Sequence, residues 1–195
     1  MPFLTPVTLQ GELVTLEPLS LEHHDELVTA TNDGRLWELW YTSVPGPDGM
    51  RAEIQRRLRL LAEGSMLPFA VRRADTGAIC GMTTFMNADA ANRRVEIGST
   101  WTAKSAQRTG VNTASKLLLL THAFEELDCI AVEFRTHWLN HQSRAAIARL
   151  GAKQDGVLRN HQRMPDGSLR DTVVFSITAA EWPAVRNHLQ HALRR

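Results

Sequence analysis

The sequence predicts an α/β domain of the α+β type, in which a mixed, mostly antiparallel central sheet carries helices on both faces. The chain has 195 residues, enough for one well-buried domain and short for two. Hydrophobic residues make up 43% and charged residues 22%, which is ordinary globular composition. Strand-like segments occur both in neighbouring runs joined by turns and singly between helical segments. We therefore expect residues 1–195 to form a single domain.

The first third of the chain predicts one strand and three helices. Residues 12–18 alternate between apolar and polar side chains and are rich in β-branched residues, which indicates a strand. Ser20 is suited to cap a helix that runs to about residue 30. The tryptophans of segment 37–40 are three residues apart and indicate a second, short helix. Asp48 is expected to cap the third helix.

The middle of the chain changes to strand periodicity. Segments 67–73, 78–86 and 93–101 are apolar and β-branched, and turn-forming residues occupy 75–77 and 87–92. Because these connections are short, we expect the three strands to form antiparallel hairpins.

The rest of the chain alternates between helices and strands. Helical patterns end in glycine or begin with capping residues, and the last two strands flank a hairpin turn of Pro, Asp and Gly. The expected elements are helices over 111–127 and 140–150, strands over 130–136, 153–160 and 169–177, and a last helix after a Thr178–Glu181 capping box.

Charge and cysteine content exclude several classes of protein. Lysine plus arginine (22) nearly balances aspartate plus glutamate (21), whereas a non-specific nucleic-acid binder usually has a basic excess. Cys80 and Cys129 lie far apart in apolar segments, so we expect buried free thiols rather than a disulfide or zinc framework. No apolar stretch approaches the roughly 20 residues that span a bilayer, and no signal peptide is recognisable. We expect a soluble cytoplasmic protein without nucleic-acid or membrane partners.

Residues 106–113 form the most informative motif. A glycine-containing turn that opens a helix leaves backbone N–H groups unpaired, and the helix dipole adds positive potential there. The turn lacks GxGxxG and follows hairpin-connected strands, unlike a Rossmann unit, and no Gly-Lys-Ser/Thr follows it, unlike a P-loop. The motif therefore predicts a phosphate or pyrophosphate site of another kind.

Four short motifs together resemble the GNAT superfamily of N-acetyltransferases, specifically its RimJ/RimL-like branch. The resemblance covers about residues 13–182. In order, the motifs are Val95-Glu96-Ile97-Gly98, Gln107-x-x-Gly110, Asn140-x-x-Ser143 and Arg149-Leu150-Gly151-Ala152.

The resemblance implies acetyl-CoA as co-substrate, with its pyrophosphate held by backbone amides of the turn. The pantetheine arm would follow the end of the preceding strand, in a splay between that strand and the one at 130–136. The family pattern usually has Gly or Ala where this chain has Asn112, so the grip on CoA is expected to be modified. The implied cofactor-binding residues are Gly98, Ser99, Thr100, Trp101, Thr102, Gln107, Arg108, Thr109, Gly110, Val111, Asn112, Thr113, Asn140 and Ser143.

Acetyl transfer to an amine requires a base, because a lysine-like amine has a pKa near ~10.4. Glu96 lies between apolar neighbours, where partial burial would raise the pKa of its carboxyl toward the operating pH, at which a general base works best. Glu133 is a competing base in a similar setting, and an ordinary strand carboxylate is the alternative for Glu96. The developing oxyanion would take a backbone N–H near Gly98–Thr100.

The resemblance also brings the helix start at Asn140 and Ser143 close to the thioester. Ser143 would protonate the leaving thiolate and Asn140 would bind the cofactor, while plain helix capping remains the alternative. The only tyrosine, Tyr41, lies on a segment away from that role. Trp37, Trp40 and Tyr41 are expected to pack in the core, and the alternative is that they form an aromatic wall of the acceptor pocket.

The resemblance thus implies an acetyl-CoA-dependent N-acetyltransferase that moves the acetyl group directly to a primary amine in a ternary complex. The acceptor would be a small amine, an antibiotic, or a peptide or protein N-terminus. No metal is expected, since a strand end and a loop separate His137 from His141. A homodimer is compatible with the resemblance. The alternatives are a non-catalytic CoA-binding or sensing protein and an unrelated interaction module.

Overall fold

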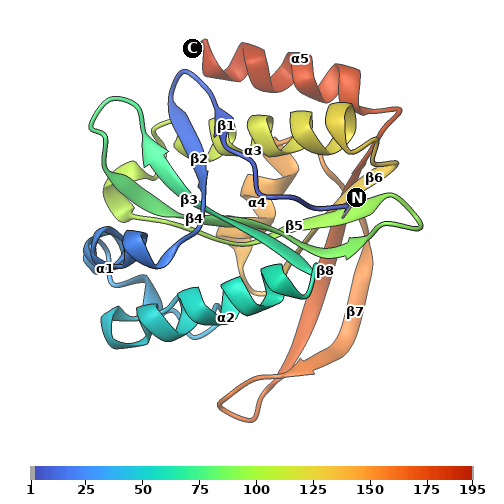
Figure 1. Cartoon of the computed structure of the whole chain (residues 1–195). Helices are drawn as coiled ribbons and strands as arrows, with labels where there is room; N and C mark the ends of the chain where they lie inside the picture. The colour runs from blue at the N-terminus through green and yellow to red at the C-terminus, as the bar shows by residue number, and fades with distance from the viewer. Residues whose placement is uncertain (1–2, 195) are drawn as a thin grey trace.

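An eight-stranded sheet of order β1-β2-β3-β4-β5-β6-β8-β7 separates two layers of helices in the computed structural model, which describes residues 3–194 (Figure 1). The predicted fold class is confirmed. The strands are β1 (Leu9–Gln10), β2 (Val14–Pro18), β3 (Met66–Arg73), β4 (Ile79–Asp89), β5 (Arg94–Thr102), β6 (Ala131–His137), β7 (Lys153–Arg163) and β8 (Leu169–Thr178). The helices are α1 (His24–Asn32), α2 (Met50–Ala62), α3 (Val111–Thr121), α4 (His141–Arg149) and α5 (Trp182–Leu193).

All neighbouring strands are antiparallel except β5 and β6, which are parallel. The β5–β6 ladder has only three residue pairs, from Arg94↔Ala131 to Glu96↔Glu133. Beyond Glu96, the rest of β5 has no strand partner on its β6 side. The sheet therefore opens in its middle, at the place where the resemblance expects the pantetheine arm.

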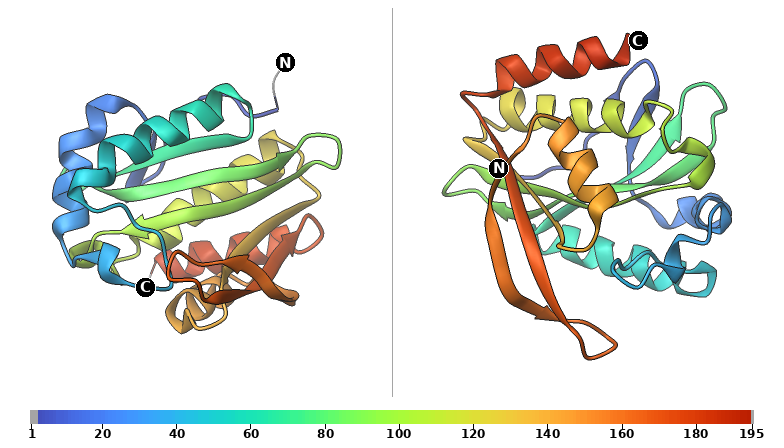
Figure 2. Two further views of the ribbon diagram at one scale, coloured as in Figure 1. Left: turned by 90° about the horizontal axis from the view of Figure 1, so that it is seen from below. Right: turned by 180° about the vertical axis from the view of Figure 1, so that it is seen from behind.

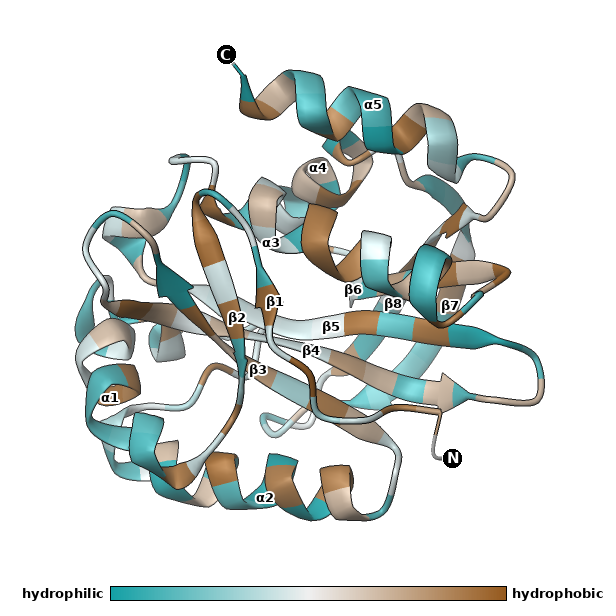
Figure 3. Ribbon diagram, turned by 45° about the horizontal axis from the view of Figure 1, so that its top comes forward, coloured by the Kyte–Doolittle hydropathy of each residue, from teal (hydrophilic) through white to brown (hydrophobic). Residues whose placement is uncertain are grey.

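Helices lie on both faces of the sheet (Figure 2). We call the two sides the α2 face, on which α1 and α2 lie, and the α3 face, on which α3 and α4 lie, with α5 packed against α3. Apolar residues of these helices belong to the core, and the hydropathy colours alternate along each helix as expected for amphipathic helices (Figure 3). Cys80 and Cys129 are buried and unbridged, and burial raises the pKa of each thiol to about 11. Within residues 3–194, no helix combines the length and apolarity that a membrane crossing requires.

Several details differ from the sequence-based expectations. Glu181 is itself the N-cap of α5, so its hydrogen bonds with Thr178 do not form the expected capping box. The short strand β1 was not expected. Trp37 lies in a single 3₁₀ turn, Leu36–Glu38, and Trp40 lies beyond it, so no helix forms there. Asp48 does not cap α2, because Gly49 occupies the N-cap and Asp48 lies inside a preceding 3₁₀ turn.

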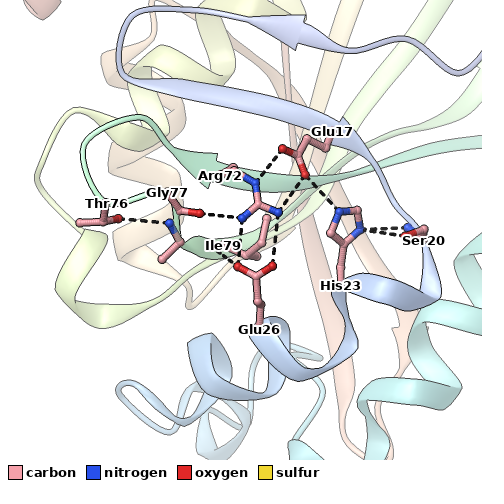
Figure 4. Close-up of polar contacts among 9 residues, drawn as sticks. Glu17, Ser20, His23, Glu26, Arg72, Thr76, Gly77 and Ile79 are labelled. Atoms are coloured by element: carbon pink, nitrogen blue, oxygen red, sulfur yellow. Dashed lines mark hydrogen bonds and ion pairs between the residues drawn. The ribbon is translucent and has the colours of Figure 1, made fainter.

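An ion-pair network fastens α1 to the edge of the sheet (Figure 4). Arg72 of β3 donates two hydrogen bonds to Glu17 of β2, at 2.7 and 3.1 Å, and two to Glu26 of α1, at 3.0 and 3.3 Å. The imidazole of His23 lies 3.1 Å from the second oxygen of Glu17. These contacts join β2 and α1, which are neighbours in the sequence, to the distant strand β3, and they lie away from the opening between β5 and β6.

Candidate active site

The turn before α3 has the backbone geometry of an anion site. Gly110 is the N-cap of α3 with φ +87°, a conformation that glycine adopts without strain. The amide of Ala114 is the first in the helix with a helical acceptor, the carbonyl of Gly110 at 2.9 Å. The amides of Val111, Asn112 and Thr113 precede it and remain available to a ligand.

A cavity of about 450 Å³ lies next to this turn, between α3, α4 and α5. Asn112 and Thr113 line it from α3, and Gly151 lines it from the end of α4. Asn112 occupies the second position of the helix, which a side chain tolerates, so its presence in place of Gly or Ala causes no backbone strain. The polar end of Asn112 is instead part of the wall of the cavity.

Other residues of the turn tie it to the end of β5. The side-chain amide of Gln107 donates to the carbonyl of Thr102 at 3.0 Å, and the hydroxyl of Thr109 donates to the carbonyl of Ala106 at 2.6 Å. Arg108 is exposed beside them. The indole of Trp101, by contrast, is buried in the core. The segment from β5 to α3 is thus one connected structure, held by side-chain contacts to its own backbone.

Strand β5 contains a bulge within the segment predicted to contact the acyl donor. Thr84 of β4 pairs with Gly98, but Met82 pairs with Trp101, so Ser99 and Thr100 together oppose one residue of β4. Ser99 has φ +47°, in the left-handed region. The bulge displaces the backbone at the point where β5 has already lost its β6 partner.

Glu96 is a buried carboxylate on the α2 face of the sheet. Its Oε2 accepts a hydrogen bond from the side-chain amide of Asn87 at 2.8 Å and lies 3.5 Å from Nε of Arg135. Burial raises the pKa of Glu96, and the contacts with Asn87 and Arg135 only partly oppose this effect. A carboxyl with a raised pKa accepts a proton more readily, so Glu96 has the properties of a general base.

Glu133 has the opposite environment, although it pairs directly with Glu96 across the two parallel strands. Its carboxylate accepts hydrogen bonds from Arg135, at 2.9 Å, and from Arg94. Burial acts to raise the pKa of Glu133, but the hydrogen bonds of these two arginines outweigh it and lower the pKa. The geometry therefore favours Glu96 over Glu133 as the base, and gives Glu133 the role of holding Arg135.

Register places further polar residues on the same face as Glu96. Alternate residues of a strand share a face, so Arg135 and His137 of β6 lie on the α2 face with Glu133. Thr172 of β8 pairs with His137, and the hydroxyl of Thr172 accepts a hydrogen bond from Nε of Arg170 at 3.0 Å. Burial, and then the charge of Arg170, lower the pKa of His137, which favours a neutral imidazole.

The loop between α1 and α2 reaches this polar surface. The rings of Trp40 and His137 meet edge to face, with centroids 5.3 Å apart, and Tyr41 packs against Trp40 at 5.6 Å. Trp40 is 55% exposed. Trp40 is therefore not a core residue, and Tyr41 lies near the α2-face site although its segment is distant in the sequence.

Asn140 and Ser143 stand at the start of α4, immediately after β6. The side-chain oxygen of Asn140 accepts a hydrogen bond from the amide of Ser143 at 2.9 Å, so Asn140 caps α4. The hydroxyl of Ser143 has no hydrogen-bond partner within residues 3–194 and is partly accessible. That hydroxyl remains free to donate a proton.

Sequence reasoning did not identify Asn87, Arg135, His137 or Arg170 as site residues. Polar side chains at every second position of β6, between apolar ones, were the available signal, since a strand with one polar face borders either solvent or a site. The sequence could not show that this face adjoins Glu96. In the described part of the chain, no three His, Cys, Asp or Glu side chains are grouped in a way that could hold a metal ion.

Comparison with known proteins agrees with this geometry. Residues 14–153 match the family model described as an acetyltransferase (GNAT) domain, and the chain belongs to this family. A candidate ribosomal N-acetyltransferase, YdaF of Bacillus subtilis (strain 168), is 37% identical over 106 residues. That match spans 54% of this chain and 57% of the length of the curated relative.

Solved structures share the whole fold. A GCN5-related N-acetyltransferase from Brucella melitensis is 31% identical with a TM-score of 0.85, and the match covers 98% of this chain and 87% of that one. Mycobacterium smegmatis RimJ in complex with CoA-disulfide is 26% identical with a TM-score of 0.80, over 96% of this chain and 95% of that one. The expected GNAT membership with RimJ/RimL-like relatives is confirmed.

GNAT acetyltransferases use acetyl-CoA, and the residues of this chain fit that molecule. The free amides of the first turn of α3 and the exposed Arg108 suit a pyrophosphate. The cavity beside Asn112 and Thr113 adjoins those amides, and the separation of β5 from β6 leaves backbone groups unpaired near the turn.

Proposed function

We propose that this protein is an N-acetyltransferase that uses acetyl-CoA and acetylates a primary amine directly, with both substrates bound together. The observation that carries the proposal is the raised pKa of buried Glu96 on a strand whose next residues lose their β6 partner. A proton acceptor thus lies beside a free backbone edge in a fold that binds CoA. Both cysteines are buried, with pKa values raised to about 11, which argues against an acyl-enzyme.

The residues divide the reaction between them as follows. Glu96 accepts the proton of the amine, directly or through water, and the amine nitrogen bonds to the acetyl carbonyl carbon as the carbon–sulfur bond breaks. Backbone groups of Gly98–Thr100 stabilise the charge that develops on the carbonyl oxygen. The free hydroxyl of Ser143 gives its proton to the departing thiolate and regains one from water, while Glu96 releases the proton of the amine to water, so both residues return to their starting state. Asn140 fixes the start of α4 that carries Ser143.

For the acceptor we propose the N-terminal amine of a peptide or protein. The names of YdaF and RimJ support this choice, and so does the exposed surface around the site. Trp40, Trp138 and Leu139 are 55%, 40% and 47% exposed next to the end of β6, which suits an extended chain better than an enclosed small molecule.

Thiol release from acetyl-CoA over a panel of acceptors tests the proposal. The panel contains short peptides with free N-termini, the same peptides with blocked N-termini, free amino acids, polyamines and an aminoglycoside. We expect release only with free N-terminal peptides, accompanied by a mass increase of one acetyl group. Saturable CoA binding without turnover of any amine would instead identify a CoA-sensing protein.

A further inference from the structure

Two buried basic side chains approach the bulge of β5 from opposite faces of the sheet. Arg57 of α2 is 1% exposed, and its guanidinium donates to the hydroxyl of Thr84 at 2.7 Å and to the carbonyl of Ser99 at 3.1 Å. Lys116 of α3 is 5% exposed, and its Nζ donates to the hydroxyls of Thr83 and Thr100 at 3.0 and 2.7 Å.

The two contacts are related by the pleat of the sheet. Thr83 and Thr84 are consecutive on β4, so their side chains point to opposite faces. Each of the two side chains donates to one of these threonines and to one of the two consecutive residues, Ser99 and Thr100, that form the bulge. Together they join β4 to β5 at the register shift, Arg57 from the α2 face and Lys116 from the α3 face.

Packing alone gives no reason for these two basic groups. Arg57 has a carboxylate partner, since its Nε donates to Glu53 at 2.7 Å, but the hydrogen bonds of Lys116 go only to the two hydroxyls. Burying a basic amine without a carboxylate partner costs free energy that a methionine of similar length would avoid, and burial lowers the pKa of Lys116 to about 7. The cost is offset if the hydrogen bonds of the two groups hold the polar atoms of the bulge in a conformation that apolar side chains cannot hold.

The bulge requires such support. Ser99 adopts φ +47°, which is unfavourable for a residue with a Cβ, and its carbonyl points to Arg57 instead of completing a ladder. On the β6 side the segment has no strand partner at all. Gly98 and Trp101 keep their β4 partners on either side, so within the bulge Arg57 supplies a contact that holds Ser99 and Lys116 one that holds Thr100.

We propose that Arg57 and Lys116 are positioning residues that clamp the β5 bulge and so aim the backbone of Gly98–Thr100 at the reacting carbonyl. This inference rests on the proposed function for its catalytic consequence, but the clamp itself is a property of the free protein. It predicts that neither residue contributes directly to CoA affinity, which depends on the turn before α3.

Hydrogen–deuterium exchange of the free protein, together with steady-state kinetics, tests the clamp. In Arg57→Met and in Lys116→Met, the amides of residues 98–102 should exchange at least about tenfold faster. The kcat should fall by about 100-fold, as expected when reacting groups are misplaced by about 1 Å. The Kd for CoA, measured by calorimetry, should stay within about threefold of the native value.

Matched controls separate the clamp from a general loss of charge. Arg56→Met removes a neighbouring arginine that also pairs with Glu53, and Lys153→Met removes an exposed lysine paired with Glu181. Both controls should leave exchange at 98–102 and kcat unchanged. If the clamp variants match the controls in exchange, or lose activity without faster exchange, the inference is wrong.

Threonine variants cover the possibility that a methionine variant does not fold. Thr84→Val and Thr83→Val each remove one hydroxyl acceptor, whereas the serine substitutions at these positions keep it. The valine variants should show the fast exchange and the serine variants should not; equal exchange in the two sets would overturn the clamp. If the native protein acetylates no amine, the proposed function fails, but the exchange comparison still decides the clamp.

Discussion

Glu96 and Glu133 stand side by side on parallel strands, yet their surroundings move their pKa values apart. Glu96 is more deeply buried and has one amide donor and a distant arginine, so burial dominates and the pKa rises. Glu133 accepts from two arginines, whose hydrogen bonds overcome burial and lower the pKa. At the scale of single residues, this difference decides which carboxylate is suited to take a proton.

Replacing Glu96 with glutamine should reduce kcat by about 100-fold or more, the usual contribution of a general base. In the native protein, activity should fall as pH drops through the raised pKa of Glu96, so the acidic limb of the kcat/KM profile, which reports the free enzyme, lies above the ordinary glutamate value of about 4.3. The limb should disappear in Glu96→Gln. A Glu96→Gln variant with native kcat and an unchanged profile would exclude Glu96 as the base.

Gly110 offers a second test at the residue scale. An alanine there must adopt φ +87° and brings its Cβ to 3.3 Å from Leu13. Gly77→Ala is the control, because Gly77 has φ +70° in a hairpin turn with open space around it. Both variants should lose about 1 kcal/mol of unfolding free energy. Only Gly110→Ala should also weaken CoA binding by calorimetry; equal affinity in both variants would contradict the proposed pyrophosphate site.

At the scale of elements, α1 is attached to the sheet mainly through charges at its start and apolar side chains along its inner side. The guanidinium of Arg72 donates hydrogen bonds to the carboxylates of Glu17 and Glu26 and to the carbonyl of Gly77, the last at 2.6 Å (Figure 4). One arginine thus links β2, β3, α1 and the β3–β4 turn. The α1–α2 loop that carries Trp40 follows α1, so this network also supports the wall of the site.

Arg72→Met should lower the free energy of unfolding at neutral pH by about 1–2 kcal/mol. This loss is smaller than for a fully buried network, because the side chains are partly exposed. The hydrogen bond of Arg72 lowers the pKa of Glu17, so this stabilisation is full above the unfolded-state pKa of about 4.3 and is lost as pH falls through the folded-state value. Denaturant titrations at pH 7 and pH 3 measure it.

The matched control for that titration is Arg73→Met, which removes the next residue and its pair with the exposed Asp75. It should destabilise the protein much less than Arg72→Met, because solvent screens this exposed pair. A loss in Arg72→Met that is no larger than in Arg73→Met, or that persists unchanged at pH 3, would show that the network contributes nothing specific.

At the scale of the whole molecule, the sheet consists of two parts joined by three residue pairs of β5 and β6. One part, β1–β5, holds the bulge and the turn, and the other, β6–β8, ends in a hairpin that projects from the body of the molecule (Figure 2). The proposed CoA site lies where the two parts separate. A ligand there adds contacts across the weakest junction of the sheet.

Saturating CoA should therefore stabilise the whole fold. At a free concentration of 100 times its Kd, the free energy of unfolding should rise by about 2.7 kcal/mol, which raises Tm by roughly 5–10 °C for a chain of this size. Exchange should slow in β5 and β6 together. A native protein whose Tm does not respond to CoA would contradict the proposal, and Gly110→Ala provides the weakened comparison.

The sequence by itself determined what depends on near neighbours. The strand segments 67–73 and 93–101, glycine ends such as Gly151, and the Asn140 cap are encoded within a few residues, because backbone hydrogen bonding and strand propensity are local. The turn before α3 belongs to the same class. Errors arose at Asp48 and Trp37, where competing 3₁₀ turns and tertiary contacts overrode local preference.

Only the tertiary structure decided which side chains meet. The register of β5 with β6 gave Glu96 and Glu133 their different arginines, and helix packing brought Arg57 and Lys116 to the same bulge from opposite faces. Such contacts join residues tens of positions apart, and no local pattern encodes them, because they depend on strand order and on how helices settle on the sheet. A strand carboxylate and a helical lysine look ordinary in the sequence, and the burial that makes them unusual exists only in the folded molecule.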